Sequence, residues 1–162
     1  MENKVFTLLN EQIWLENRAS FYYLNLSVLC ALNGYKGMSD FFKRQSEEER
    51  QHMLKICDYI LDSGETPIVP ANTFLDMEEL SFGALKLFED SLFNEKEITT
   101  SFYNILNQCK EECDYTTENF IQYFITEQRE EEAKFKDLID ELKIIEKDAS
   151  GVGLYHFDKN IS

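Results

Sequence analysis

One segment of this sequence places an acidic and an imidazole side chain inside an otherwise apolar helical stripe. The stripe recurs in steps of three and four residues through Met38, Phe42, Gln45, Glu49, His52, Ile56 and Tyr59. Glu49 and His52 are three residues apart, so on a helix both side chains point to the same inward face. Carboxylate oxygens together with an imidazole nitrogen are suitable ligands for a transition metal such as iron. The pair is therefore a candidate for metal binding inside a helical core.

Three further segments interrupt an apolar stripe in the same way. The stripes are Leu9, Ile13, Glu16, Ala19 and Tyr23; Leu85, Phe88, Leu92, Glu95, Ile98 and Phe102; and Phe120, Phe124, Gln128, Glu131, Phe135, Leu138 and Leu142. A lone buried Glu or His is more often a core-edge residue or part of a satisfied hydrogen bond. Four interruptions at the same level of the bundle are harder to explain in this way. Burying several carboxylates costs several kcal/mol per ion unless opposite charge compensates them. No Lys or Arg falls within the four stripes, so we expect a pair of divalent cations to supply that charge.

The chain that positions these side chains is predicted to be all-α. Two prolines and six glycines leave long segments without a helix breaker. The expected helices cover about residues 3–33, 37–64 and 81–108, and a fourth follows the polar run 110–114 and continues to about residue 148. Ser81 is the expected N-cap of the third helix. Residues 150–153 read as a hinge before a short tail at 154–162.

The connection lengths predict how these helices are arranged. Only a few residues separate the first two helices, which makes them antiparallel neighbours, and the last two are also closely spaced. The link at 65–80 contains Pro67 and Pro70, and its 16 residues can extend about 50 Å at ~3.3 Å per residue. The second helix is only about 40 Å long at ~1.5 Å per residue. The link can therefore span the bundle and make the second and third helices parallel, which predicts a four-helix bundle with one long crossover.

Composition limits the classes of partner. The 162 residues suit a single domain over 1–162, and a net charge of −15 argues against nucleic acid and against an anionic membrane. An acidic surface or cavity instead attracts cations. The N-terminus lacks a basic region followed by an apolar run, and no stretch approaches the roughly 20 apolar residues of a membrane span. We therefore expect a soluble, unexported, cytoplasmic protein.

Four cysteines lie inside helix-like segments without the paired spacings of a zinc site: Cys30, Cys57, Cys109 and Cys113. A cytosolic chain of this size does not need disulfides, so reduced thiols are expected. Cys109 and Cys113 would share a helical face only if one helix ran through both. Their role stays open at this point.

Several motifs resemble those of bacterial-type non-haem ferritins. They are Asn10-Glu11-Gln12 leading to Glu16 and Tyr23, Glu48-Glu49-Arg50-Gln51-His52, Glu95, and Glu127-Gln128-Arg129-Glu130-Glu131-Glu132. The tail at 153–162 is similar to the short fifth helix of that group. The similarity covers essentially the whole chain in order and spacing. The resemblance implies a ferritin-like bundle that stores iron and has ferroxidase activity.

The resemblance also implies roles for individual residues. Glu16, Glu49 and His52 would form a first iron site, and Glu49 would bridge to a second site with Glu95 and Glu131, near Gln128. A third site is implied at Glu48, Glu127 and Glu130. Tyr23 matches a tyrosine that can supply an electron, although a core aromatic bonded to a glutamate is an equally good interpretation. Glu132 is better explained as part of a solvated acidic face.

The implied reaction oxidises two Fe(II) ions, about 3.5–4 Å apart, with O2 or hydrogen peroxide. The ferric product would be stored as an oxide mineral in a hollow homo-oligomeric cage of 24 subunits. Di-iron carboxylate oxidases and bacterioferritins repeat the Glu-x-x-His motif on the fourth helix. This chain differs from them there, because Gln128 and Glu131 stand at the corresponding positions. The missing histidine implies a weaker second site from which iron can leave. Arg50 occupies the place of the haem-ligating Met of bacterioferritins, so we expect no haem.

Three alternatives remain open at this stage. A non-storing di-iron oxidase or peroxidase of the rubrerythrin-like type is disfavoured because the chain has no Cys-x-x-Cys module. A structural bundle with an inactive centre is disfavoured by the full ligand set named above. A starvation-type mini-ferritin would carry a short helix in the middle connection, where this chain has Pro67 and Pro70.

Overall fold

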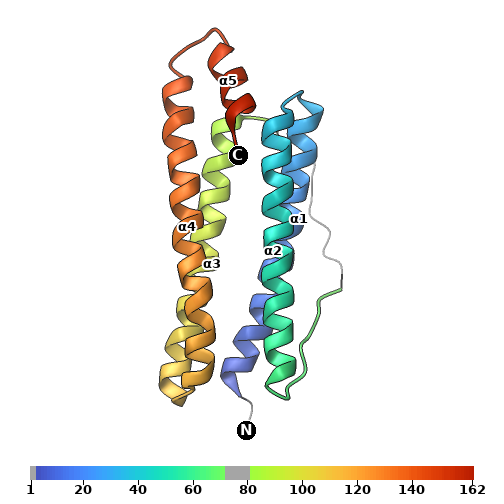
Figure 1. Cartoon of the computed structure of the whole chain (residues 1–162), viewed down its shortest axis with the longest axis vertical. Coiled ribbons are helices and arrows are strands. Elements are labelled where there is room, and N and C mark those ends of the chain that lie inside the picture. The colour runs from blue at the N-terminus through green and yellow to red at the C-terminus, as the bar shows by residue number, and fades with distance from the viewer. Residues whose placement is uncertain (1–2, 72–80) are drawn as a thin grey trace.

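The structure is a computed structural model that describes residues 3–71 and 81–162. Within those ranges the chain forms five α-helices and no strand: α1 Lys4–Leu32, α2 Lys36–Asp62, α3 Ala84–Glu112, α4 Tyr115–Ile145 and α5 Val152–Asn160. The predicted all-α class is confirmed, with four long helices and a short fifth (Figure 1). None of the helices in the described ranges combines the length and apolar character that a bilayer span requires.

Capping side chains and glycines define several helix ends. Asn3 caps α1 by accepting hydrogen bonds from two backbone N–H groups of the first turn, at 3.0 and 3.4 Å. Asp114 caps α4 by accepting from the Thr117 backbone N–H at 3.0 Å. Gly34 turns the chain between α1 and α2 with φ +84°, a left-handed conformation that glycine adopts without steric cost. These local signals explain why the predicted ends of α1 and the start of α4 lie close to the observed ones.

The third helix differs from its predicted bounds at both ends. Its N-cap is Gly83 and not Ser81, and the helix continues past Gln108 to Glu112. The apolar stripe ends earlier, but Lys and Glu are good helix formers, so the backbone hydrogen bonds continue through the polar run. Cys113 ends the helix, with φ +54° in the left-handed region. Loss of apolar periodicity was therefore the wrong criterion for the end of this helix.

All four cysteines are free thiols, in agreement with the expected reduced state. Cys109 is buried, whereas Cys113 is exposed because it caps the helix end. Burial raises the pKa of the Cys109 thiol to about 11. The two thiols do not share a helical face, so the structure gives no support to a joint metal site.

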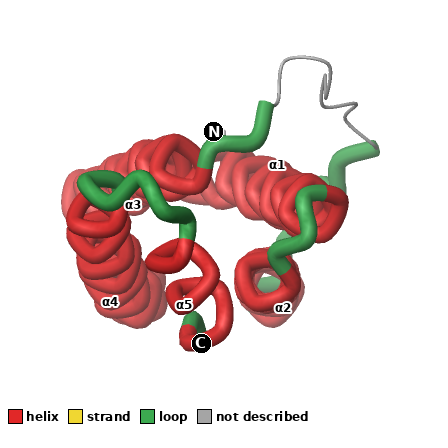
Figure 2. The backbone as a smooth tube through the Cα atoms, turned by 90° about the horizontal axis from the view of Figure 1, so that it is seen from above, coloured by secondary structure: helices red, strands yellow, loops and turns green. Residues whose placement is uncertain are grey.

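The four long helices run in the predicted directions. Figure 1 shows α2 and α3 both starting at the end of the bundle where α5 lies and finishing at the opposite end, so these two helices are parallel. α1 packs along α2, α3 packs along α4, and α1 also contacts α3. Seen down the bundle, α5 lies between α2 and α4 (Figure 2). The bundle therefore brings the middles of all four long helices to one level.

The start of the crossover follows α1. Its first residues, from 65 to 71, form no helix, and the Ile68 backbone N–H donates to the Asn10 side-chain oxygen at 2.7 Å. The rest of the connection expected at 65–80 falls on residues 72–80, which lie outside the described residues.

The core consists of two apolar clusters with a polar layer between them. One cluster includes Leu9, Ile13, Ile56, Ile98, Phe102 and Phe124, and the other includes Tyr23, Phe42, Phe88 and Phe135. The buried polar side chains that separate them along the four helices include Glu16, Gln45, Glu49, His52, Glu95, Gln128 and Glu131. These are the polar residues that interrupt the four apolar stripes of the sequence. The apolar clusters on both sides exclude water from this layer.

α5 closes one end of the bundle by docking on α2 and α4. Asp158 is buried and accepts a hydrogen bond from the Met38 backbone N–H at 2.8 Å. Gly37 allows this close approach, because a Cβ at that position would lie 1.7 Å from the Asp158 carbonyl oxygen. Phe157 packs edge-on against Phe88, with ring centroids 5.7 Å apart. The predicted short C-terminal helix is therefore part of the core.

Candidate metal centre

Glu16, Glu49 and His52 form a buried cluster in the polar layer. Glu16 comes from α1, and the other two residues lie one turn apart on α2. One potential ligand atom from each lies within 4.8 Å of the others, a grouping of three that is found nowhere else in the described part of the chain. His52 Nδ1 is 3.2 Å from Glu49 Oε2 and 3.9 Å from Glu16 Oε2. The three side chains thus converge on a volume small enough for one cation.

Two carboxylate oxygens of this cluster have no hydrogen-bond partner. They are Glu16 Oε2 and Glu49 Oε1, and both are fully buried. A buried carboxylate oxygen without a partner carries a large desolvation penalty. The other oxygen of Glu16 accepts from Gln12 Nε2 at 2.7 Å, so the carboxylate is held in place while one oxygen stays free. A divalent cation among these oxygens would remove the penalty.

The pKa values of the carboxylates in this cluster also indicate a place for a cation. Burial raises the pKa of Glu16 well above its ordinary value, and the neighbouring Glu49 charge raises it further. The pKa of Glu49 is also raised well above the ordinary value, first by burial and then by the Glu95 charge. Like charges held together out of water favour the protonated form. A cation reverses this preference, because metal binding displaces protons from its ligands.

Glu95 of α3 is held by two neutral donors. The Tyr23 hydroxyl donates to Glu95 Oε1, and Gln128 Nε2 donates to Glu95 Oε2 at 2.9 Å. Burial raises the pKa of Glu95 to about 7, and the bonds from Tyr23 and Gln128 partly offset this rise. Burial together with the Glu95 charge raises the pKa of Tyr23 well above its ordinary value, so its hydroxyl stays a donor. Both oxygens of Glu95 are therefore engaged by the protein itself.

Glu131 of α4 is engaged in a different way. Its Oε2 accepts from Gln45 Nε2 at 2.8 Å, and its Oε1 lies 2.7 Å from Lys134 Nζ. The four stripes themselves contain no Lys or Arg, but a lysine from outside them reaches this carboxylate. Lys134 stands three residues after Glu131, outside the stripe itself, and its side chain reaches inward with 32% exposure. One of the predicted ligands thus already has a positive partner.

The residues of the implied third site are more open to solvent. Glu48 and Glu130 are exposed and Glu127 is half-buried, and Glu48 Oε2 lies 3.7 Å from Lys134 Nζ. Glu127 and Glu48 line a surface pocket that also reaches His52. Glu132, expected to be solvated, is half-buried and accepts a hydrogen bond from Thr99 Oγ1 at 3.0 Å. The structure brings the first set together and keeps Glu95 and Glu131 in the same layer. Of the third set, Glu48 and Glu127 share a surface pocket.

Several side chains that support the ligands were not among the predicted site residues. Gln12 donates to Glu16, and its own oxygen accepts from the Ser101 hydroxyl of α3 at 2.6 Å. The spacing of four between Gln12 and Glu16 was a usable signal, because residues four apart on a helix are neighbours. The spacing of three between Glu131 and Lys134 was a signal of the same kind. Ser101 carried no comparable signal, since it contacts Gln12 from another helix.

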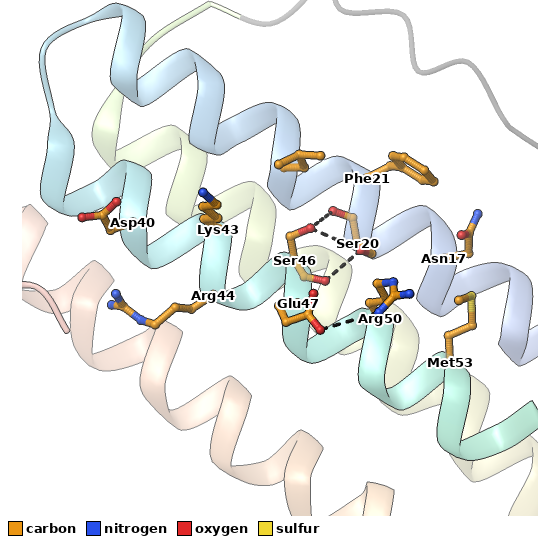
Figure 3. A pocket seen from close by; sticks show the side chains of 11 residues that line it. Asn17, Ser20, Phe21, Asp40, Lys43, Arg44, Ser46, Glu47, Arg50 and Met53 are labelled. Atoms are coloured by element: carbon orange, nitrogen blue, oxygen red, sulfur yellow. Dashed lines mark hydrogen bonds and ion pairs between the residues drawn. The ribbon is translucent and has the colours of Figure 1, made fainter. Parts of the chain in front are cut away.

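A separate groove lies on the α1–α2 face, where Arg50 is placed. Figure 3 shows Arg50 beside Met53 in this groove, which Phe21 of α1 also lines, and the Arg50 guanidinium is 3.8 Å from Glu47 Oε1. Ser20 of α1 and Ser46 of α2 connect the two helices there, because each hydroxyl donates a hydrogen bond to the other residue's backbone carbonyl at 2.7 Å. A guanidinium is protonated at any physiological pH and offers no lone pair to haem iron. This is the physical reason for expecting no haem at this position.

Fold and cluster define a class: a four-helix bundle whose buried polar layer carries a carboxylate–histidine set of metal-ligand type. A family model for the ferritin-like domain matches residues 6–145. The chain therefore belongs to the ferritin-like family, as its motifs suggested.

Individual relatives agree with this assignment. A bacterial non-haem ferritin of Staphylococcus saprophyticus is 37% identical over 155 residues, covering 96% of this chain and 92% of the relative. A bacterial non-haem ferritin of Escherichia coli is 35% identical over 156 residues, covering 95% and 91%. Among solved structures, an open-pore ferritin from the archaeon Archaeoglobus fulgidus superimposes with a TM-score of 0.92 at 28% identity, covering 100% of this chain and 97% of that one.

Proposed function

We propose that this chain is an iron-storage ferritin subunit with ferroxidase activity, which oxidises Fe(II) to Fe(III) among its buried carboxylates. The observation that carries the proposal is the pair of unpartnered buried oxygens, Glu16 Oε2 and Glu49 Oε1, beside His52. A bundle built only for stability would not leave two acidic oxygens without donors in its core. Similarity to bacterial non-haem ferritins supports iron as the cation.

In the proposed reaction, two Fe(II) ions are the substrates. The first enters among Glu16, Glu49 and His52, and the second is held between Glu49, Glu95 and Glu131. Each Fe(II) gives up one electron, and O2 takes both electrons with two protons to form hydrogen peroxide. When peroxide is the oxidant, it takes two electrons and two protons to form two water molecules. Glu49 is proposed to bridge the two positions, as the family resemblance implies. Its place supports this, since it lies beside His52 and its pKa is also raised by the charges of Glu95 and Glu131.

The second position is proposed to be the weaker one. Gln128 is neutral and donates to Glu95, so it stabilises the carboxylate without adding a charge for the metal. At Glu131, the cation competes with Lys134 and Gln45 for the two carboxylate oxygens. A centre with one firm and one weak position favours release of the oxidised iron, which supports storage as the outcome.

The storage part of the proposal includes a hollow homo-oligomeric cage, 24 subunits by family resemblance, in the cytoplasm. Its support is the match over most of the chain to ferritins and a net charge of −15, which favours the collection of cations. Size measurement in solution tests this part. A cage of 24 copies of the 19.1 kDa chain has a mass of about 460 kDa, whereas a dimer would favour the non-storing oxidase.

The activity is tested by replacing one ligand at a time. Glu49→Ala and His52→Ala are expected to slow the initial rate of Fe(II) oxidation, followed by near-ultraviolet absorbance, by at least about tenfold. Glu47→Ala is the matched control, because Glu47 is an exposed glutamate two residues before Glu49. Wild-type rates in both ligand variants, with their helical content intact, would refute the assignment.

A further inference from the structure

Lys134 occupies a position that resembles that of a bound cation. Its Nζ lies 2.7 Å from Glu131 Oε1, 2.7 Å from Gln45 Oε1 and 3.7 Å from Glu48 Oε2. These oxygens come from both α2 and α4, so the ammonium group sits between two helices. Its neighbours are two carboxylates and an amide oxygen, the oxygen donors that a divalent cation also selects.

The contacts of Lys134 overlap the proposed iron ligands. Glu131 is a proposed ligand of the second iron, and Glu48 belongs to the set implied for a third. The two bonds from Lys134 and Gln45 engage both oxygens of Glu131. An incoming ion that binds Glu131 through Oε1 therefore competes with Lys134 for that oxygen.

The side chain of Lys134 has room to leave. It is 32% exposed, its ammonium lies 5.8 Å from the centre of the Phe41 ring, and it reaches Glu131 along its own helix, three residues away. A lysine is a long flexible chain that carries a strongly hydrated charge, so it can swing into water when a stronger cation takes its place. Glu16, Glu49 and His52 have no such internal competitor, since their two unpartnered oxygens face no donor.

We propose that Lys134 is a tethered competitor for the second metal position: it neutralises Glu131 in the iron-free protein and weakens divalent-ion binding there. This inference rests on the proposed iron centre and adds a residue that determines the affinity of its weaker half. The first position, at Glu16, Glu49 and His52, is unaffected by Lys134. The difference in affinity between the two positions is thus partly set by one lysine, in addition to the missing histidine of α4.

Calorimetric titration of the metal-free protein with Zn(II), a divalent ion without redox chemistry, tests this inference. Lys134→Met keeps a long side chain and removes the charge. It is expected to tighten the second binding event by at least about tenfold, or about 1.4 kcal/mol, and to leave the first event unchanged. Lys136→Met is the matched control, because it removes the same charge from an exposed site on the same helix, where Lys136 pairs with Asp140.

Two further variants assign the effect to the contact itself. Lys134→Arg keeps a cation near Glu131 and is expected to bind the second ion no more than a few-fold differently from wild type. In a Glu131→Gln background, Lys134→Met is expected to have no effect, because the shared ligand is gone. This double-variant comparison separates competition at Glu131 from a general loss of positive charge.

The possible results distinguish a failure of the Lys134 proposal from a failure of the proposed metal centre. A second event in Lys134→Met that equals or is weaker than that of the wild type, or an equal gain in Lys136→Met, would overturn the role of Lys134 while leaving the first position intact. Absence of any tight event in the wild-type protein would overturn the proposed metal centre and this inference together.

Discussion

The Tyr23 hydroxyl donates a hydrogen bond to Oε1 of Glu95 and so joins α1 to α3 across the polar layer. Both side chains are buried, and the Tyr23 ring lies parallel to those of Phe42 and Phe135 with centroids 6.0 Å away. Aromatic packing therefore fixes the ring, and the hydroxyl fixes one oxygen of a proposed iron ligand. Tyr23 is thus a core aromatic bonded to a glutamate, which agrees with one of the two interpretations of its sequence position. That it supplies an electron stays a prediction.

Replacing Tyr23 with Phe tests this contact. The change leaves Glu95 Oε1 without its donor, which is expected to cost about 1–3 kcal/mol of stability in the metal-free protein. The melting temperature should fall by roughly 2–4 °C per kcal/mol for a chain of this size. Fe(II) oxidation should also slow if Tyr23 supplies an electron. Tyr103→Phe, at an exposed tyrosine of α3, should change neither quantity, and an unaltered Tyr23→Phe protein would contradict the role.

Neutralising Glu16 is expected to stabilise the metal-free protein while it weakens metal binding. In Glu16→Gln, the new amide can keep the bond from Gln12 through its oxygen and donate to Glu49 with its nitrogen, which removes a buried like-charge contact. The melting temperature of the metal-free variant at pH 8 should therefore rise, and Zn(II) affinity at the first position should fall by at least about tenfold. Glu47→Gln, an exposed change, is the control. A lower melting temperature would show that Glu16 is not under electrostatic strain.

The metal-free protein is expected to lose stability as pH rises from about 5 to 8. The folded-state pKa of Glu95 is about 7, above its ordinary value of 4.5, and those of Glu16 and Glu49 are also raised. The folded state therefore binds protons more tightly than the unfolded chain, so this stabilisation is complete below the ordinary pKa and disappears as pH passes the folded-state pKa.

Melting curves at pH 5.5 and 8 measure this effect, and Glu95→Gln should make the pH dependence shallower. Zn(II) should raise the melting temperature more at pH 8 than at pH 5.5, because the metal competes with protons for the same oxygens. A metal-free protein that is more stable at pH 8, with Glu95→Gln showing the same slope as wild type, would contradict the raised pKa values.

The docking of α5 is expected to depend on Gly37. A Cβ at this position would lie 1.7 Å from the Asp158 carbonyl oxygen, so Gly37→Ala must push α5 away from α2. We expect a loss of about 2–4 kcal/mol, typical of steric conflict and core disruption, together with faster hydrogen exchange in α5. Gly83→Ser adds a side chain at the N-cap of α3, where a Cβ would make only an ordinary contact with Lys86 Cβ at 3.9 Å, and should be neutral or slightly stabilising. Wild-type exchange in Gly37→Ala would show that α5 is not held there.

The sequence by itself determined the helices, their directions and the level of the polar layer. Stripes with steps of three and four place five side chains inward: Glu16, Glu49, His52, Glu95 and Glu131. On a helix, the direction in which a side chain points follows from its position in the helical repeat, which the local sequence sets. Short and long connections likewise set the antiparallel and parallel pairs. Where the local signal was ambiguous, as in the polar run at 110–114, the predicted end of α3 was wrong. The single domain over 1–162 stays a prediction.

Only the tertiary structure decided how these inward side chains divide among partners. Glu16 and Glu49 each keep one oxygen free, whereas Glu95 is held by Tyr23 and Gln128, and Glu131 by Gln45 and Lys134. Tyr23, Gln45 and Gln128 stand on other helices than the carboxylates they hold, so distance in space and not spacing in sequence selects them. Lys134 is the exception, because it lies three residues after Glu131 on the same helix. For that reason the sequence could name the candidate ligands and the missing histidine at the proposed second position, but the partners that hold Glu95 and Glu131 follow from helix packing.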